Sequence, residues 1–139
     1  MFRNMPFTTI QKPLTMEQVD YPENTITEMS KTDFQNALLA NPGGLVIKFG
    51  AEWCGPCKKI DPVIRHWFSQ FPPTIQTAVI DIDESFEIYA FLKSKKQVNG
   101  VPVILFYKKG NQTWVPDDVI VGADEVAVIR FFERCLSSV

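Results

Sequence analysis

Two of the three cysteines in the chain, Cys54 and Cys57, enclose a Gly-Pro dipeptide. A cysteine thiolate can attack a disulfide bond, and a second thiol close by can then complete the exchange. A bridge between cysteines this close in sequence closes a very small loop, so it restrains little of the unfolded chain. The spacing therefore predicts that the pair serves thiol–disulfide exchange rather than stability.

The sequence around the pair places the first sulfur at the start of a helix. An apolar run at residues 45–49, interrupted by Lys48, is typical of a buried strand, and apolar residues at helical spacing follow the pair. Unpaired N–H groups and the positive dipole end at a helix N-terminus favour a thiolate. About 1–2 kcal/mol of such interaction raises the thiolate population at neutral pH several-fold. We therefore expect Cys54 to be the nucleophile and Cys57, one turn further on, to be the resolving thiol.

The two residues between the cysteines suit the same arrangement. Pro56 falls in the first helical turn, where its missing N–H is not needed, and Gly55 leaves room for a substrate backbone. The same cysteine spacing also makes half of a zinc site, but zinc needs two further ligands and the chain has no second such pair. We therefore expect no metal and no cofactor beyond the redox-active cysteines, with a purely structural pair as the other alternative.

The elements that must hold the pair alternate between strand and helix. The predicted strands lie over residues 25–29, 45–49, 74–82, 103–107 and 119–121. The predicted helices follow a Ser30 N-cap, the cysteine pair, Glu84 and the turn after the last strand. The order βαβαβαββα predicts an α/β fold, a three-layer α/β/α sandwich with a central mixed sheet.

The length of 139 residues and an apolar content of 45% fit one globular domain. Residues 1–24 are polar and contain three prolines without a sustained period, so they are predicted to form a flexible extension of a domain over residues 25–139. The predicted inner faces of the first and last helices consist of Phe34, Leu38 and Leu39, and of Val126, Ile129, Phe132 and Leu136.

Charge and composition narrow the classes of partner. A net charge of −2 gives no electrostatic footprint for nucleic acid. The first residues contain no continuous apolar segment of the kind that a signal peptide or a membrane span needs. Three cysteines suit a reducing compartment. We therefore expect a cytoplasmic protein without nucleic-acid or membrane partners, and import into an organelle stays open because residues 1–16 carry basic but no acidic side chains.

Several motifs together resemble the thioredoxin family. The segment Ala51 to Lys58 is similar to the family's active site, and it carries the Gly-Pro of thioredoxins where disulfide isomerases usually have other residues. Pro62 matches the proline that kinks the family's active-site helix. The segment Gly100-Val101-Pro102 matches the one that carries the family's cis-proline, and Gly110 and Gly122 match later glycines.

The resemblance covers about residues 25–139 and implies a thioredoxin-like protein-disulfide reductase. In such an enzyme a mixed disulfide forms at Cys54 and is resolved by Cys57. The implied partners are disulfide-containing protein substrates and an electron donor of the thioredoxin-reductase type, and the implied state is a monomer. The alternative is a thioredoxin-fold adaptor or subunit that acts mainly through surface binding. Turnover of a protein disulfide would separate the two.

The resemblance also implies roles for residues around the cysteines. Pro102 should be cis and pack beside the two sulfurs. Val101 should offer its backbone to an extended substrate segment, as in the addition of a short strand. Trp53 should shield the site and contact partner proteins.

One departure from the family lies in the strand before the cysteines. Thioredoxins typically carry a buried aspartate where this chain has Lys48, and their partner lysine corresponds to Val79. Three arrangements are open. Lys48 could pair with Asp81, which shares the strand face of Val79; it could be desolvated and serve as a base; or its ammonium could reach water. A charged Lys48 would also help hold a Cys57 thiolate, so Lys48 and Asp81 are candidate support residues.

Two further departures concern packing and a loop. Gly50 stands where many family members have an aromatic residue, which predicts looser packing behind the site. The stretch from Asn111 to Val121 is longer than the usual hairpin. It is either a partner-specific loop or a tolerated surface insertion.

Overall fold

The computed structural model of the chain describes residues 19–139, which form a mixed sheet of four strands. The strands are β2 (Gly44–Gly50), β3 (Ile75–Asp81), β4 (Val103–Lys108) and β5 (Asp118–Val121), and their order in the sheet is β3-β2-β4-β5. β2 pairs parallel with β3 and antiparallel with β4, which pairs antiparallel with β5. The central position of β2 explains why all seven of its residues are buried.

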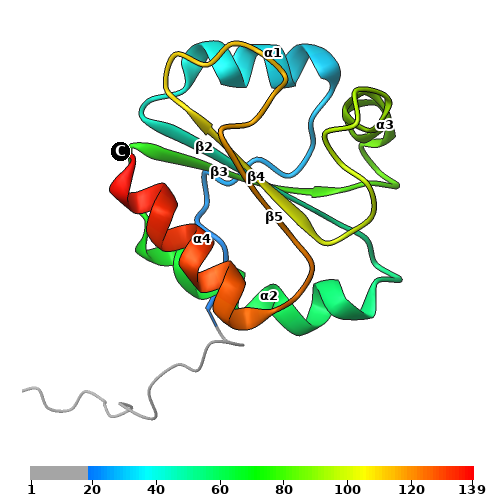
Figure 1. Ribbon diagram of the computed structural model, residues 1–139, viewed down its shortest axis with the longest axis vertical. Coiled ribbons are helices and arrows are strands. Elements are labelled where there is room, and N and C mark those ends of the chain that lie inside the picture. The colour runs from blue at the N-terminus through cyan, green and yellow to red at the C-terminus, as the bar shows by residue number, and fades with distance from the viewer. Residues whose placement is uncertain (1–18) are drawn as a thin grey trace, which may run out of the picture.

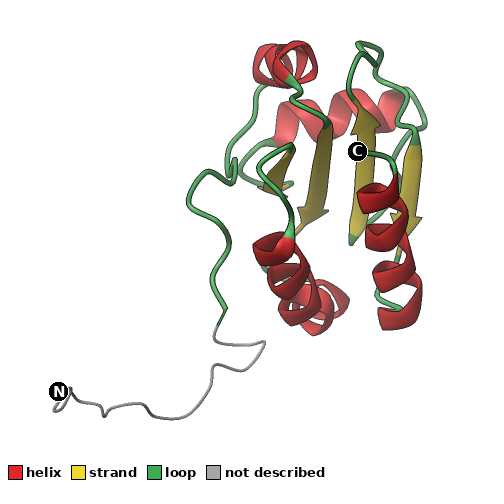
Figure 2. Ribbon diagram, turned by 90° about the vertical axis from the view of Figure 1, so that its left-hand side faces the viewer, coloured by secondary structure: helices red, strands yellow, loops and turns green. Residues whose placement is uncertain are grey.

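Helices cover both faces of this sheet (Figure 1). They are α1 (Lys31–Ala40), α2 (Gly55–Gln70), α3 (Phe86–Ser94) and α4 (Glu125–Ser137). α1 and α3 contact each other on one face, and α2 and α4 contact each other on the opposite face. Figure 2 shows the strands between the two pairs of helices. The predicted three-layer α/β sandwich with a mixed sheet is therefore confirmed.

The pleat of β2 divides the core into two clusters. Leu45, Ile47 and Phe49 pack with residues of α1 and α3, whereas Val46 packs with residues of α2 and α4. Because successive side chains of a strand point to opposite faces, Lys48 faces the α2 side. Within residues 19–139, no helix combines the length and the apolar content that crossing a bilayer requires.

The start of α1 shows how local sequence sets an element boundary. The Ser30 hydroxyl accepts a hydrogen bond from the Asp33 N–H, and the Asp33 carboxylate accepts one from the Ser30 N–H, both at 3.0 Å. This reciprocal capping box satisfies two N–H groups that a helix end otherwise leaves unpaired. The predicted N-cap is thus confirmed.

Three details of the predicted elements are wrong. The strand expected over residues 25–29 is reduced to one parallel bridge between Ile26 and Ala78. Leu39 is 64% exposed, because α1 turns Phe34 and Leu38, which lie four residues apart on one face, toward the sheet. Val126 is 58% exposed, whereas Phe132 is buried as predicted, Ile129 and Leu136 are partly buried, and the other buried residues of α4 are Val128, Phe131 and Cys135.

The segment before α1 lies against α2. The Tyr21 ring packs on Phe68 with 5.8 Å between ring centroids, and its hydroxyl donates a hydrogen bond to Asp61. Arg65 also binds Asp61, and its guanidinium lies 4.4 Å from the centre of the Tyr21 ring. Most of the predicted extension, residues 1–24, lies outside the described residues, and the boundary at residue 24 stays a prediction.

Candidate active site

The two cysteines lie at the first turn of α2 and are joined by a disulfide. Cys54 is the N-cap residue, and its sulfur accepts a hydrogen bond from the Cys57 N–H at 3.1 Å. The Lys58 N–H donates to the Cys54 carbonyl at 3.2 Å and continues the helix. An N–H directed at the sulfur favours the thiolate once the bond is reduced. The structure thus places the predicted pair at a helix N-terminus.

The two residues between the cysteines leave one side of the site open. Pro56 lies within the first turn of α2, where its missing N–H breaks no helical hydrogen bond. A Cβ atom built on Gly55 would meet no other atom within 4 Å. A polypeptide segment can therefore approach the sulfurs from this side without first displacing a side chain of residue 55.

The loop before β4 forms another wall of the site. The peptide bond between Val101 and Pro102 is cis, as the family resemblance implies. The Val101 carbonyl oxygen lies 3.8 Å from the Cys54 sulfur. The Tyr89 hydroxyl donates to the Gly100 carbonyl at 3.1 Å and accepts from the Gly100 N–H at 2.8 Å. This pair of hydrogen bonds from α3 anchors the loop next to the cysteines.

Trp53 is the large exposed aromatic residue next to the pair. It is 68% exposed, and its indole N–H donates a hydrogen bond to the Asp83 carboxylate at 2.9 Å. An exposed indole with one anchored edge offers an apolar face to a partner at little cost in side-chain freedom. Sequence reasoning did not identify Asp83, because nothing in the sequence links it to a tryptophan thirty positions away.

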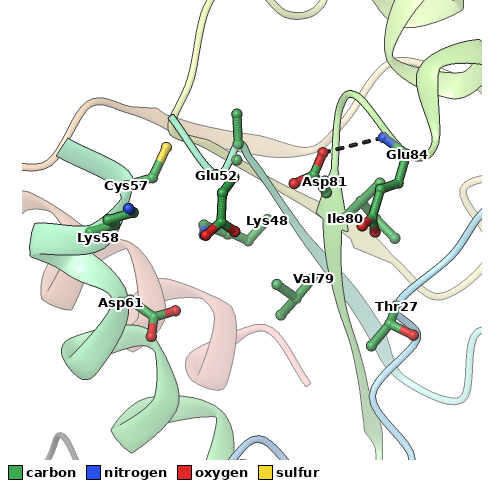
Figure 3. Close-up of a pocket in the computed structure, with 12 residues that line it drawn as sticks. Thr27, Lys48, Glu52, Cys57, Lys58, Asp61, Val79, Ile80, Asp81 and Glu84 are labelled. Atoms are coloured by element: carbon green, nitrogen blue, oxygen red, sulfur yellow. Dashed lines mark hydrogen bonds between the residues drawn. The ribbon is translucent and has the colours of Figure 1, made fainter. Parts of the chain in front are cut away.

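A cavity of about 320 Å³ opens behind the cysteines, between α2 and the sheet (Figure 3). Lys48 extends into it from β2 toward the helix that carries Cys57 and Asp61. Asp81 lines the same cavity from β3. Residues 19–139 contain no group of three or more His, Cys, Asp or Glu side chains arranged to hold a metal ion.

Lys48 and Asp81 share the cavity without forming an ion pair. No carboxylate oxygen of the described residues lies within 4.0 Å of the Lys48 amine. One oxygen of Asp81 instead accepts hydrogen bonds from the N–H groups of Asp83 at 2.8 Å and Glu84 at 3.2 Å. Lys48 is only 6% exposed, so most of its surface is removed from water. Of the three arrangements open from sequence, the structure favours a desolvated amine.

Burial lowers the pKa of Lys48 below the ordinary value of 10.5, and the charge of Asp61 acts in the opposite direction. Asp61 is held in place by the Tyr21 hydroxyl and by Arg65. Burial raises the pKa of Tyr21, so its hydroxyl stays a proton donor to that carboxylate. The spacing of Asp61 and Arg65, four residues apart on one helix, could have predicted their ion pair from the sequence. No sequence pattern predicts that Tyr21 joins them.

We expect the substitution Lys48→Met to stabilise the oxidised protein by about 1–3 kcal/mol, the usual cost of a buried polar group without a partner. Between the lowered pKa of the folded state and the value of 10.5, the unfolded chain binds more protons than the folded one. Wild-type stability therefore rises with pH in this window, and the advantage of the variant shrinks. Denaturant unfolding at neutral and alkaline pH measures both effects, and a destabilised variant at neutral pH contradicts the expectation.

Comparison with known proteins agrees with this geometry. The family model described as Thioredoxin matches residues 25–133. Thioredoxin-2 of Saccharomyces cerevisiae is 30% identical over 99 residues, which are 71% of this chain and 86% of the yeast protein. The mitochondrial thioredoxin O2 of Arabidopsis thaliana is 37% identical over 108 residues, covering 76% of this chain and 64% of the plant protein.

Solved structures are similar over the same part of the chain. Oxidised thioredoxin O2 from Arabidopsis thaliana superimposes with a TM-score of 0.66 at 29% identity, covering 84% of this chain and 99% of that one. Plasmodium falciparum thioredoxin gives a TM-score of 0.63 at 25% identity, covering 78% and 98%. Since the family match runs through the cysteine pair and on to residue 133, the chain belongs to the thioredoxin family and is a thiol–disulfide oxidoreductase.

Proposed function

We propose that the protein reduces disulfide bonds of other proteins, with Cys54 as the attacking thiol and Cys57 as the resolving thiol. The observation that supports these roles is the position of Cys54 as N-cap, where its sulfur receives the Cys57 N–H at 3.1 Å. This N–H and the helix dipole stabilise a thiolate at Cys54 more than at Cys57, which lies inside the first turn.

The exchange then proceeds in two steps. The Cys54 thiolate attacks one sulfur of the substrate disulfide, and the other substrate sulfur leaves as a thiolate and takes a proton from water. Cys57 then loses its proton and attacks the Cys54 sulfur. The mixed disulfide breaks, the second substrate sulfur leaves, and the Cys54–Cys57 disulfide remains. A dithiol donor restores the reduced pair.

The residues around the pair fit supporting roles in this exchange. The open space at Gly55 and the first-turn position of Pro56 suit the approach of a substrate segment. We assign substrate contact to the exposed ring of Trp53 and to the Val101 backbone, which the cis bond to Pro102 presents beside Cys54. Lys48 and Asp81, from β2 and β3, support the site from the cavity behind it.

The proposal extends to partners and compartment. Disulfide-containing proteins are the substrates, a reductase of the thioredoxin-reductase type is the electron donor, and the protein acts as a monomer. The cytoplasm is the proposed location, and organelle import is the alternative, since the similar proteins include a mitochondrial thioredoxin of Arabidopsis thaliana. The net charge of −2 supports neither a nucleic-acid nor a membrane partner.

We expect the wild-type protein to accelerate the reduction of a protein disulfide by a small dithiol, because each turnover regenerates a reactive thiolate. The rate is measured from the loss of the substrate disulfide with and without the protein. A rate equal to that of the dithiol alone would contradict the reductase function. That result would favour an adaptor that binds partners through its surface.

A further inference from the structure

Lys48 is buried at the centre of the sheet. It lies in β2, opposite Val79 of β3 and Ile104 of β4. Only 6% of its surface is exposed, whereas lysine is ordinarily among the residues least often buried without a partner. Its neighbours Ile47 and Phe49 face α1 and α3, so the lysine points toward α2 and the cysteines.

The Lys48 amine has no counter-ion in the oxidised structure. Within the part of the chain that the structure describes, all ion pairs closer than 4.0 Å belong to arginines. Both oxygens of Asp61 are engaged by Tyr21 and Arg65. An amine that is removed from water and has no partner carries its charge at a cost in free energy. Any anion that forms beside it therefore relieves this cost.

Gly50 gives the end of the Lys48 side chain its place next to Cys57. A Cβ atom at position 50 would lie 2.8 Å from the Lys48 Nζ and 3.4 Å from the Cys57 Sγ. The amine and the sulfur therefore border the same small volume. With glycine at position 50, no side chain of that residue occupies the space between them.

Among the described residues, four carboxylates and two cations surround the amine, but no carboxylate oxygen lies within 4.0 Å of it. The titratable and charged groups that face it are Glu52 after β2, Cys57, Lys58, Asp61 and Arg65 on α2, and Asp81 and Glu84 at the end of β3. Loss of water is the largest influence on the pKa of Lys48 and lowers it, Arg65 lowers it further, and Asp61 and Asp81 raise it. Reduction of the disulfide adds a new anion to this set, the Cys57 thiolate.

We propose that Lys48 is the counter-ion of the Cys57 thiolate in the reduced protein and makes the Cys54–Cys57 disulfide easier to reduce. The inference rests on the exchange chemistry proposed above. A dithiol donor gives up two electrons and two protons and becomes a disulfide. The electrons break the Cys54–Cys57 bond. The protonated Lys48 amine then faces the Cys57 thiolate, the Cys54 sulfur is held as a thiolate at the helix N-terminus, and the two protons of the donor pass to water.

The direction of the effect follows from a thermodynamic cycle. In the oxidised protein the Lys48 amine is buried without a partner, so removing it relieves a cost. In the reduced protein the same removal also takes away the partner of the thiolate. The substitution Lys48→Met therefore stabilises the oxidised form more than the reduced form, and the disulfide becomes harder to reduce.

The test is the equilibrium of each variant with glutathione redox buffers. We expect Lys48→Met to shift the equilibrium constant about tenfold toward the disulfide, which corresponds to a potential about 30 mV more negative. The pKa of the Cys57 thiol, followed by thiolate absorbance, rises in the same variant. Lys58→Met is the matched control. Lys58 lines the same cavity but is exposed, so water screens its charge and the equilibrium constant changes by less than about twofold.

A Lys48→Met potential equal to that of the wild type, or less negative, would overturn the inference. If this variant does not fold, an NMR titration of the Lys48 amine in the wild-type protein replaces it. The pKa of that amine must then be higher in the reduced than in the oxidised protein, and equal values overturn the inference. Both measurements are made at equilibrium. If Lys48→Met shifts the potential but the wild-type protein does not accelerate reduction of a protein disulfide, the proposed reductase function is contradicted. The role of Lys48 as counter-ion then still holds.

Discussion

Replacing Cys54 by serine reduces dithiol-driven reduction of a protein disulfide to the rate of the dithiol alone, whereas Cys57→Ser arrests the protein as a covalent complex with its substrate. The difference follows from the geometry of α2. Cys54 is the N-cap residue whose sulfur receives an N–H, so its loss removes the attacking thiolate. Without Cys57 the mixed disulfide at Cys54 has no neighbouring thiol to resolve it. Non-reducing electrophoresis and mass spectrometry detect the complex.

Cys135 provides the matched control for these two variants. It is fully buried in α4, and burial raises the pKa of its thiol to about 12, so it supplies almost no thiolate at neutral pH. We expect Cys135→Ala to keep the wild-type turnover rate. A stable complex in the Cys54→Ser variant would reverse the assigned roles of the two active-site thiols.

Replacing Phe132 by alanine lowers the free energy of unfolding by about 3–5 kcal/mol, which corresponds to a fall in Tm of about 10 °C. Phe132 is fully buried between α4 and α2, where its ring contacts those of Trp67, Phe68, Phe71 and Phe131. Truncation leaves a cavity bordered by rigid rings that cannot easily collapse into it. Denaturant and thermal unfolding of the oxidised protein measure the loss.

Val126→Ala is the control for this substitution. It lies on the same helix, but its side chain is 58% exposed, so we expect a change within about 0.5 kcal/mol. The comparison also tests which face of α4 is buried. A loss at Val126 as large as that at Phe132 would mean that Val126 is buried as the apolar pattern predicts, and a small loss at Phe132 would contradict its burial.

Most of the fold could be predicted from hydrophobic periodicity and helix caps. The strands around the cysteines and the Ser30 cap lie where the pattern indicates, because runs such as 45–49 and 103–107 have few alternatives to a buried strand. The inner face of α4 could be predicted only in part. Phe132 is buried and Ile129 and Leu136 are partly buried as expected, but Val126 is exposed, and contact with α2 buries Phe131 as well.

The candidate site, like the fold, could be predicted from the sequence only in part. The cysteine pair and its helix could be predicted from spacing, whereas the cis bond at Pro102 came from family resemblance, since most bonds before proline are trans. The state of Lys48 could not be predicted. The protonation of Lys48 depends on its distances to Asp81 and Asp61. These distances are set by the packing of separate elements, which no local sequence pattern encodes.

Positions 48 and 50 also depend on each other as sites of substitution. An alanine at position 50 would displace the Lys48 amine, whose Nζ lies 2.8 Å from the place of the new Cβ. The same alanine in a chain with methionine at position 48 meets no such amine. The two substitutions are therefore not additive, and the order in which a lineage acquires them decides which intermediate is disturbed. A lysine at position 48 therefore favours a glycine at position 50.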